Sequence, residues 1–328
     1  MSLQTAEKAP PGVEEFVVGV ETRLGELLEQ TPEVQLRGGE IIAEASRHLT
    51  LASAAKRARP RLVYHFGRAL SSSVDELVDI AAAAELVHTA SLLHDDVIDA
   101  GEERRERSTV NTQWDNITAV LSGDALLCEA LERLAGYPTS LTRTAVGVVA
   151  EMTRGIMHEV TARRRVDLTR EDWWSVASGK TGALFGWCGS AVAQLMGAQE
   201  LVERFESCGR RLGVAFQLAD DLKDLIPYDS GKDRWADIRN GNPSYPLICA
   251  VDEAPEIGRS LQAHWEDERG AQSADEIGEA VVETSAVEQT RRLVAREVDG
   301  ALSALGEYAE EPGGRRIALW ARRLCEEV

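Results

Sequence analysis

The sequence predicts an all-α protein, and three observations support this prediction. Apolar residues recur at three- and four-residue steps along most of the chain, which is the spacing of an α-helix. Ala, Leu, Glu and Arg dominate these stretches, and all four are good helix formers. The alternation of apolar and polar residues that would indicate strands is nearly absent. We therefore expect one multi-helix domain over residues 13–328, preceded by a flexible tail over residues 1–12.

The expected helices follow one another from residue 13 and are separated by clusters of turn-forming residues. The clearest helices are predicted at Val13–Leu28, Gly39–Leu51, Val74–Ile98, Asn116–Leu134, Leu141–Arg163 and Gly179–Leu195. Breaks are predicted where Gly, Pro, Asn and Asp gather, at residues 136–138, 227–231, 240–243, 270–273 and 312–314.

Composition bounds the class of protein. The chain has 328 residues, of which 44% are hydrophobic, so it can bury a sizeable core. Its net charge of -19 would repel nucleic acid and anionic lipid. The start of the sequence carries no apolar signal segment, and no run approaches the ~18 apolar residues of a membrane helix. The five cysteines lack metal-ligand spacing and are expected to be buried free thiols. These features predict a cytoplasmic protein without a transmembrane segment.

One acidic pattern, Asp-Asp-x-x-Asp, occurs twice. Residues 91–99 read SLLHDDVID and residues 216–224 read FQLADDLKD, each at the end of an apolar run. On a helix, the first and last Asp of each copy lie on one face, one turn apart. Like charges at this spacing destabilise a helix, and carboxylates near its C-terminal end oppose the dipole. The same unfavourable choice, made twice, indicates function.

Pairs of carboxylates without thiols suit Mg²⁺, which keeps several waters and completes its octahedron with substrate phosphates. Two facing Asp pairs would therefore leave room for a diphosphate bridged by metal ions. A solvated acidic face is the alternative interpretation in a chain with 55 acidic residues. The second copy favours the functional interpretation.

Basic residues near the acidic patterns provide the cations that a diphosphate needs. They form short clusters in an otherwise acidic chain: Lys56, Arg57 and Arg59; Arg104, Arg105 and Arg107; Lys180; and Lys232. Arginine suits a bidentate grip on phosphate oxygens. Each residue could instead be an ordinary solvated cation, but together, beside the Asp pairs, they favour a two-phosphate site.

Five segments resemble the motifs of trans-isoprenyl diphosphate synthases, also called the polyprenyl synthetase family. They are ELVHTASLLHDDVID, FQLADDLKD, GKTGALF, AAKRARP and VLSGDALL. The resemblance extends from about Lys56 to Leu247. It implies a single-domain, multi-helix bundle of the isoprenoid-synthase type around a central cavity, Mg²⁺ dependence and a homodimer. It also implies a reaction in which an allylic diphosphate ionises and its carbocation alkylates isopentenyl diphosphate.

The resemblance also implies roles for individual residues. The metal ligands would be Asp95, Asp99 and Asp220, with Asp224, Asp96 and Asp221 contributing through water or orientation. The allylic diphosphate would be held by Arg104, Lys180 and Lys232. Isopentenyl diphosphate would be held by Lys56, Arg59, His88 and Arg105. Thr181 and Gln217 would direct oxygens at the developing cation, and Phe216 would pack on the isopentenyl group.

The chain departs from the family pattern at three places. Ala54 and Ala55 replace glycines, residues 106–111 replace a Gly-x-Pro-Thr-x-His segment, and Asn242 replaces a lysine. These changes bear on the use of isopentenyl diphosphate. They leave open a class I terpene cyclase or lyase with the same metal site, and a non-catalytic subunit is a further alternative.

Product length is predicted from the residues four and five before Asp95. Ser91 and Ala90 are small, so the floor of the cavity is expected to be open and the product to be C20 or longer. Another helix could close the cavity instead, through Leu126, Leu127 or Trp187. The allylic primer and the pathway are not indicated by the sequence.

Overall fold

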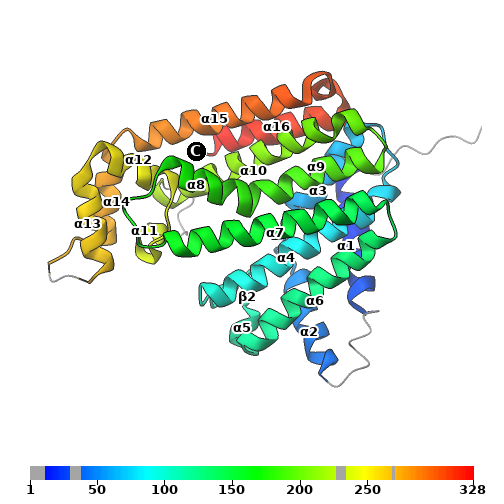
Figure 1. Cartoon of the computed structure of the whole chain (residues 1–328), viewed down its shortest axis with the longest axis horizontal. Coiled ribbons are helices and arrows are strands. Elements are labelled where there is room, and N and C mark those ends of the chain that lie inside the picture. The colour runs from blue at the N-terminus through cyan, green and yellow to red at the C-terminus, as the bar shows by residue number, and fades with distance from the viewer. Residues whose placement is uncertain (1–11, 30–37, 227–233, 268–269) are drawn as a thin grey trace, which may run out of the picture. The chain divides into compact units, whose positions relative to one another are not determined.

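The chain folds almost entirely into helices in a computed structural model, which describes residues 12–29, 38–226, 234–267 and 270–328 (Figure 1). The all-α prediction is confirmed. Within the described residues the only strands are β1 (Glu103–Arg104) and β2 (Arg107–Ser108), which pair antiparallel as a short hairpin.

The longer helices are α1 (Val13–Glu29), α2 (Gly39–Thr50), α3 (Ala58–Ala69), α4 (Val78–Ile98), α6 (Asn116–Ala135), α7 (Thr139–Ala162), α9 (Ala183–Leu195), α10 (Val202–Leu225), α13 (Pro255–Trp265), α15 (Ala286–Leu305) and α16 (Pro312–Glu326). The shorter ones are α5 (Val110–Gln113), α8 (Arg170–Ala177), α11 (Ala236–Asn240), α12 (Tyr245–Glu253) and α14 (Ala274–Glu283). A π-helical turn, η3, spans Ser178–Gly182, and three 3-10 turns are η2 (Asp75–Leu77), η4 (Gln199–Leu201) and η5 (Gly306–Glu310).

Most of the predicted helices begin and end close to the observed bounds, but one predicted break is wrong. Residues 312–314 were expected to form a loop, whereas α16 begins at Pro312. Proline is well tolerated at the first position of a helix, where its missing N–H costs no hydrogen bond. Gly313 follows it and lies so close to the His65 carbonyl oxygen that no Cβ would fit. The break at 227–231 and residues 1–11 of the expected tail lie outside the described residues.

The chain groups into two compact units, which are described separately below. Unit 1 comprises Met1–Val146, Cys188–Val202 and Glu310–Gly314. Unit 2 comprises Gly147–Trp187, Glu203–Ala309 and Arg315–Val328. The single domain expected over residues 13–328 stays a prediction.

Helix α4 forms the core of unit 1. It packs against α1, α3 and α6, and every residue from Ile80 to Leu86 is at most 1% exposed. The segment Asp75–Ile98 is long and apolar enough to cross a membrane by length and composition, contrary to the sequence-based expectation. However, 72% of its most apolar window is buried in the protein, as is typical of a core helix.

Unit 2 is built around α10, whose apolar residues Phe205, Leu212, Leu218 and Leu222 are all fully buried. Helix α8 starts with a capping box in which Thr169 and Asp172 satisfy each other's backbone N–H groups. Helix α12 packs against α8, α13 and α15.

The cysteines only partly match the expectation of buried thiols. Cys188, Cys208 and Cys249 are buried, whereas Cys128 and Cys325 are exposed.

Candidate active site

The first acidic pattern lies at the C-terminal end of α4, in unit 1. Asp95 is 8% exposed, whereas Asp99 is exposed and caps the helix. The Asp99 N–H donates to the Asp95 carbonyl oxygen at 2.8 Å, so the two residues are one helical turn apart, as predicted. The two side chains provide hard oxygen donors only, which suits Mg²⁺.

Asp96 has a different role from its two neighbours. It is 1% exposed, and its Oδ1 accepts a hydrogen bond of 2.5 Å from Arg104 Nε on β1. Burial raises the pKa of Asp96, and the positive charge of Arg104 opposes this rise. Asp96 therefore ties the β1–β2 hairpin to the end of α4 and holds the Arg104 guanidinium through its Nε.

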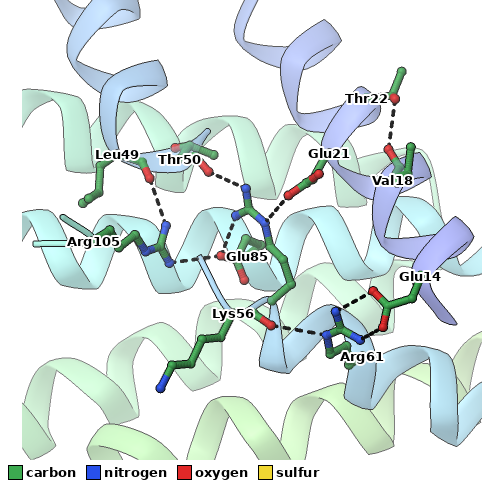
Figure 2. A network of polar contacts seen from close by, with 11 residues as sticks. Glu14, Val18, Glu21, Thr22, Leu49, Thr50, Lys56, Arg61, Glu85 and Arg105 are labelled. Carbon is green, nitrogen blue, oxygen red and sulfur yellow. Dashed lines mark hydrogen bonds and ion pairs between the residues drawn. The ribbon is translucent and has the colours of Figure 1, made fainter. Parts of the chain in front are cut away.

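A buried acid, Glu85, organises the cations of unit 1 (Figure 2). Glu85 is 1% exposed, and its Oε1 accepts hydrogen bonds from Arg57 Nη1 at 2.8 Å and Arg105 Nη2 at 3.2 Å. Arg57 also donates to the Thr50 carbonyl oxygen at 2.7 Å and to Glu21 at 3.2 Å. All three nitrogens of the Arg57 guanidinium are thus bound to protein acceptors, so this residue has a structural role.

Two of the predicted isopentenyl diphosphate residues, Arg105 and Arg59, lie near this acid. Arg105 Nη1 donates to the Leu49 carbonyl oxygen at 2.9 Å, which fixes the guanidinium from a second side. Lys56 is exposed, and its side chain extends away from Glu85 (Figure 2). Burial lowers the pKa of Arg59 to about 10, and the charge of Glu85 limits this fall.

His88 belongs to the same cluster. Its pKa lies well below the usual value, first because it is buried and then because Arg59 and Arg105 repel its charged form. Both effects favour the neutral form of the imidazole.

Unit 2 contains a pocket of about 180 Å³ at the second acidic pattern. The residues that line it are Glu159, Trp173, Val176, Ala177, Lys180, Gln217, Asp220, Asp221, Asp237, Asn242, Pro243 and Ser244. The structure thus brings together Lys180, Gln217 and Asp220, which the sequence analysis had selected independently.

Lys180 and Thr181 lie on the π-helical turn η3, a type of distortion that is frequent at functional sites. Helix α7 passes so close that a Cβ on Gly155 would lie 2.7 Å from the Lys180 backbone nitrogen. From α10, Arg210 donates to Ser178 Oγ at 3.2 Å. The turn is therefore held from both sides.

A chain of hydrogen bonds runs through Gln217. Thr181 Oγ1 donates to Gln217 Oε1 at 3.1 Å, and Gln217 Nε2 donates to Asp221 Oδ1 at 3.1 Å. Asp221 Oδ2 accepts from Trp173 Nε1 and from the Tyr245 N–H, both at 2.9 Å. Burial raises the pKa of Asp221 to about 7, and the nearby Asp220 contributes to the rise. Asp221 thereby orients the Gln217 amide so that its oxygen faces Thr181.

Three further acids belong to this site. The carboxylate of Asp220 is exposed, whereas those of Asp224 and Asp237 accept hydrogen bonds from other parts of unit 2. Asp220 is exposed toward the pocket. Asp224 Oδ1 accepts the Ala236 N–H at 2.9 Å and Oδ2 accepts the Asp237 N–H at 3.2 Å, so its carboxylate binds the first turn of α11. Burial raises the pKa of Asp237 well above its usual value, and Asn242 Nδ2 donates to Asp237 Oδ1 at 3.3 Å.

Phe216 is half-buried in an aromatic cluster of unit 2. Its ring centroid is 5.9 Å from that of Phe185 and 6.5 Å from that of Trp320. These contacts orient the ring. Its expected contact with an isopentenyl group stays a prediction.

Two parts of the predicted site stay open. Lys232 lies outside the described residues. Within the described part of the chain, no group of three or more His, Cys, Asp or Glu could by itself hold a metal ion. Asp95 and Asp99 belong to unit 1, whereas Asp220 and Asp224 belong to unit 2, and their convergence on shared ions stays a prediction.

Glu85, Glu159 and Asp237 are acids of these networks that were not selected from the sequence. The role of Glu85 could have been predicted, because a single carboxylate within an apolar run is expected to be buried and therefore to need a partner of opposite charge. Glu159 and Asp237 are not distinguished by any sequence pattern from the other acids of a chain with 55 acidic residues.

Comparisons with known proteins identify the family of this chain. A profile of the polyprenyl synthetase family matches residues 40–284. A (2E,6E)-farnesyl diphosphate synthase from Mycobacterium bovis is 33% identical over 270 residues, covering 80% of this chain and 69% of that protein. A decaprenyl diphosphate synthase structure from Rhodobacter capsulatus has a TM-score of 0.87 and 28% identity, with 96% of this chain and 97% of that chain covered. A Caulobacter crescentus polyprenyl synthase, complexed with calcium and isoprenyl diphosphate, has a TM-score of 0.84 and 25% identity, with 95% of each chain covered. The chain therefore belongs to the polyprenyl synthetase family and is a prenyltransferase of the trans-isoprenyl diphosphate synthase type.

Proposed function

We propose that this enzyme condenses an allylic diphosphate with isopentenyl diphosphate, with Mg²⁺ as cofactor, to give a trans-polyprenyl diphosphate of C20 or longer. The observation that carries the proposal is a second group of cations in unit 1, in which Arg105 donates to the buried Glu85, Arg59 lies within reach of its charge, and His88 lies near both arginines. A cyclase or lyase would need only the pocket around Lys180. A second group of cations is what a second diphosphate substrate requires.

Binding of the allylic diphosphate is assigned to the residues of the pocket and hairpin. Lys180 supplies an ammonium group, and Arg104 supplies a guanidinium that Asp96 holds through its Nε. Asp95, Asp99 and Asp220 would hold Mg²⁺, which neutralises diphosphate charge when bound and so promotes departure of the leaving group. The Caulobacter relative, complexed with calcium and isoprenyl diphosphate, supports a divalent cation in this role.

The carbon chemistry then follows. The allylic C–O bond breaks, and its electron pair leaves with the diphosphate. The double bond of isopentenyl diphosphate attacks the resulting carbocation, and a proton is lost to the departing diphosphate. Thr181 and Gln217, with the Gln217 amide oriented by Asp221, would present oxygens to the cation.

This proposal is tested by incubating the purified chain with labelled isopentenyl diphosphate, an allylic diphosphate and Mg²⁺. We expect consumption of isopentenyl diphosphate, release of pyrophosphate and a prenyl diphosphate product, all abolished by EDTA. Release of hydrocarbon without consumption of isopentenyl diphosphate would identify a cyclase or lyase instead. No diphosphate release at all would indicate a non-catalytic subunit.

Product length is proposed from the small residues before Asp95. Ala90 is fully buried, and Ser91 is half-buried with its Oγ donating to the His88 carbonyl oxygen at 2.8 Å. The relatives include both a farnesyl and a decaprenyl diphosphate synthase, so they do not fix the length.

Replacing Ser91 with phenylalanine is expected to shorten the product while turnover continues, because the ring would occupy the space into which the chain grows. Chromatography of the dephosphorylated products measures the change. Ser91→Ala is the matched control and should leave the product length unchanged. Products of equal length from Ser91→Phe and the wild type would contradict the assigned position of the floor, and C15 as the sole wild-type product would contradict an open one.

We also propose a homodimer. Helix α6 exposes Ile117 (71% exposed), Val120 and Leu121 (47% exposed) at helical spacing. A contiguous apolar stripe on an exposed helix is typical of a protein–protein interface, and a second copy of the chain would cover it.

A further inference from the structure

We propose that Glu159 makes the pocket of unit 2 selective for metal-bound over metal-free diphosphate. It does so by occupying Lys180 and by adding a negative charge to the pocket wall. The inference rests on the proposed function, because it takes Lys180 as a ligand of the allylic diphosphate.

The first support is the contact itself. Lys180 Nζ donates to Glu159 Oε2 at 2.5 Å, and the two side chains are 26% and 19% exposed. Both residues line the pocket. Glu159 lies on α7, one turn after Gly155, whose missing Cβ lets η3 approach closely enough for this pair to form. A diphosphate oxygen that approaches Lys180 must therefore compete with a carboxylate already in place.

The second support is the charge of the pocket wall. Four carboxyl groups line it, those of Glu159, Asp220, Asp221 and Asp237, and Lys180 is the sole cation among the described residues that line it. A free diphosphate carries several negative charges and would be repelled by such a wall. A metal-bound diphosphate carries less negative charge, and its metal is attracted to the carboxylates.

The third support separates Glu159 from the other acids of the pocket. Asp221 holds Trp173, Gln217 and the start of α12, and Asp237 binds Asn242. Asp220 is a predicted metal ligand. Glu159 is bound to the lysine, so its charge acts on diphosphate affinity in two ways that add together. It repels the free anion directly, and it weakens the attraction of Lys180.

The test is calorimetric binding of inorganic pyrophosphate to the full chain, in EDTA and in Mg²⁺. Glu159→Gln should bind pyrophosphate in EDTA about tenfold more tightly than the wild type, which corresponds to about 1.4 kcal/mol. In Mg²⁺ the two affinities should agree within about threefold, because the metal already offsets the added charge. The preference for metal-bound pyrophosphate is therefore expected to fall.

Two variants locate the effect at this ion pair. Compared with Lys180→Gln alone, Glu159→Gln/Lys180→Gln should gain clearly less than tenfold in EDTA, since only the direct repulsion is relieved and no ammonium remains to be released. Glu327→Gln is the matched control, because Glu327 forms a similar half-buried pair with Lys223 at 2.6 Å in unit 2, and neither residue lines the pocket. It should leave both affinities unchanged. Glu159→Ala, with folding checked by circular dichroism, should repeat the Glu159→Gln result.

Equal or weaker pyrophosphate binding by both Glu159 variants in EDTA would overturn the inference and make Glu159 a residue that merely positions Lys180. This failure is distinguishable from failure of the proposed function, in which the wild type consumes no isopentenyl diphosphate in the condensation assay. If the wild type is active in the condensation assay and the Glu159 variants bind pyrophosphate in EDTA as the wild type does, only the selectivity role of Glu159 is refuted.

Discussion

Replacing Asp95 with asparagine is expected to lower kcat/KM for the allylic diphosphate by about a thousandfold, in the range found when a single preorganised electrostatic group is removed. Asp95 is 8% exposed at the last turn of α4, and asparagine would keep its size but not its charge. Steady-state assays with labelled isopentenyl diphosphate measure the loss.

The same replacement is expected to stabilise the fold slightly. Asp95 and Asp99 repel each other across one turn, and both lie at the helix end where the dipole disfavours anions. Removing one charge should raise the free energy of unfolding by about 0.5 kcal/mol. Opposite changes in activity and stability would identify the carboxylate as functional. Asp75→Asn, an exposed acid just before the same helix, should change neither quantity appreciably. Retention of a tenth of the wild-type activity by Asp95→Asn would exclude Asp95 as a metal ligand.

Replacing Glu85 with alanine is expected to lower the free energy of unfolding by about 3–5 kcal/mol, the range for breaking a buried ion pair from one side. Arg57 and Arg105 both donate to the same Glu85 oxygen, and Arg57 is 3% exposed. Without the acid, two neighbouring guanidinium groups would remain buried without their shared counter-charge. Urea denaturation followed by circular dichroism measures the loss.

A double replacement separates charge from packing. In Glu85→Leu/Arg57→Met the buried pair is replaced by apolar side chains of similar size, and part of the stability should return, whereas Arg105 still lacks its counter-charge. Glu76→Ala, an exposed acid in the turn before α4, should alter stability by less than about 0.5 kcal/mol. A loss of under 1 kcal/mol in Glu85→Ala would show that the buried cluster contributes little to stability.

The bounds of helices were predicted well from the sequence where the helical spacing of apolar residues is regular. The spacing of apolar residues located α1, α2 and α6 to within one residue at each end. It was wrong at Pro312, where proline and glycine were taken to form a loop. The glycine is required by the close approach of the His65 carbonyl oxygen, and such a tertiary contact has no local signal.

The candidate site was predictable only in part, for a similar reason. Repeated aspartates and clustered cations were visible as patterns along the chain. The importance of Glu159 depends on Lys180, 21 residues away, and that of Glu85 depends on Arg57 and Arg105, 28 and 20 residues away. The partner of a single acid in an ion pair can be recognised only in the folded structure, where that distant residue lies next to it.

The apolar character of α4 has a consequence for biosynthesis. While this segment leaves the ribosome it has the length and composition of a membrane-spanning helix, and a targeting factor that reads only those properties would bind it. Helices α1 and α3, which later cover it, emerge first, whereas α6 follows it. Because α1 and α3 are synthesised before α4, they are available to cover part of its apolar surface as soon as it emerges. The rest of that surface stays exposed until α6 has been synthesised, and mistargeting to a membrane is most favoured during that interval.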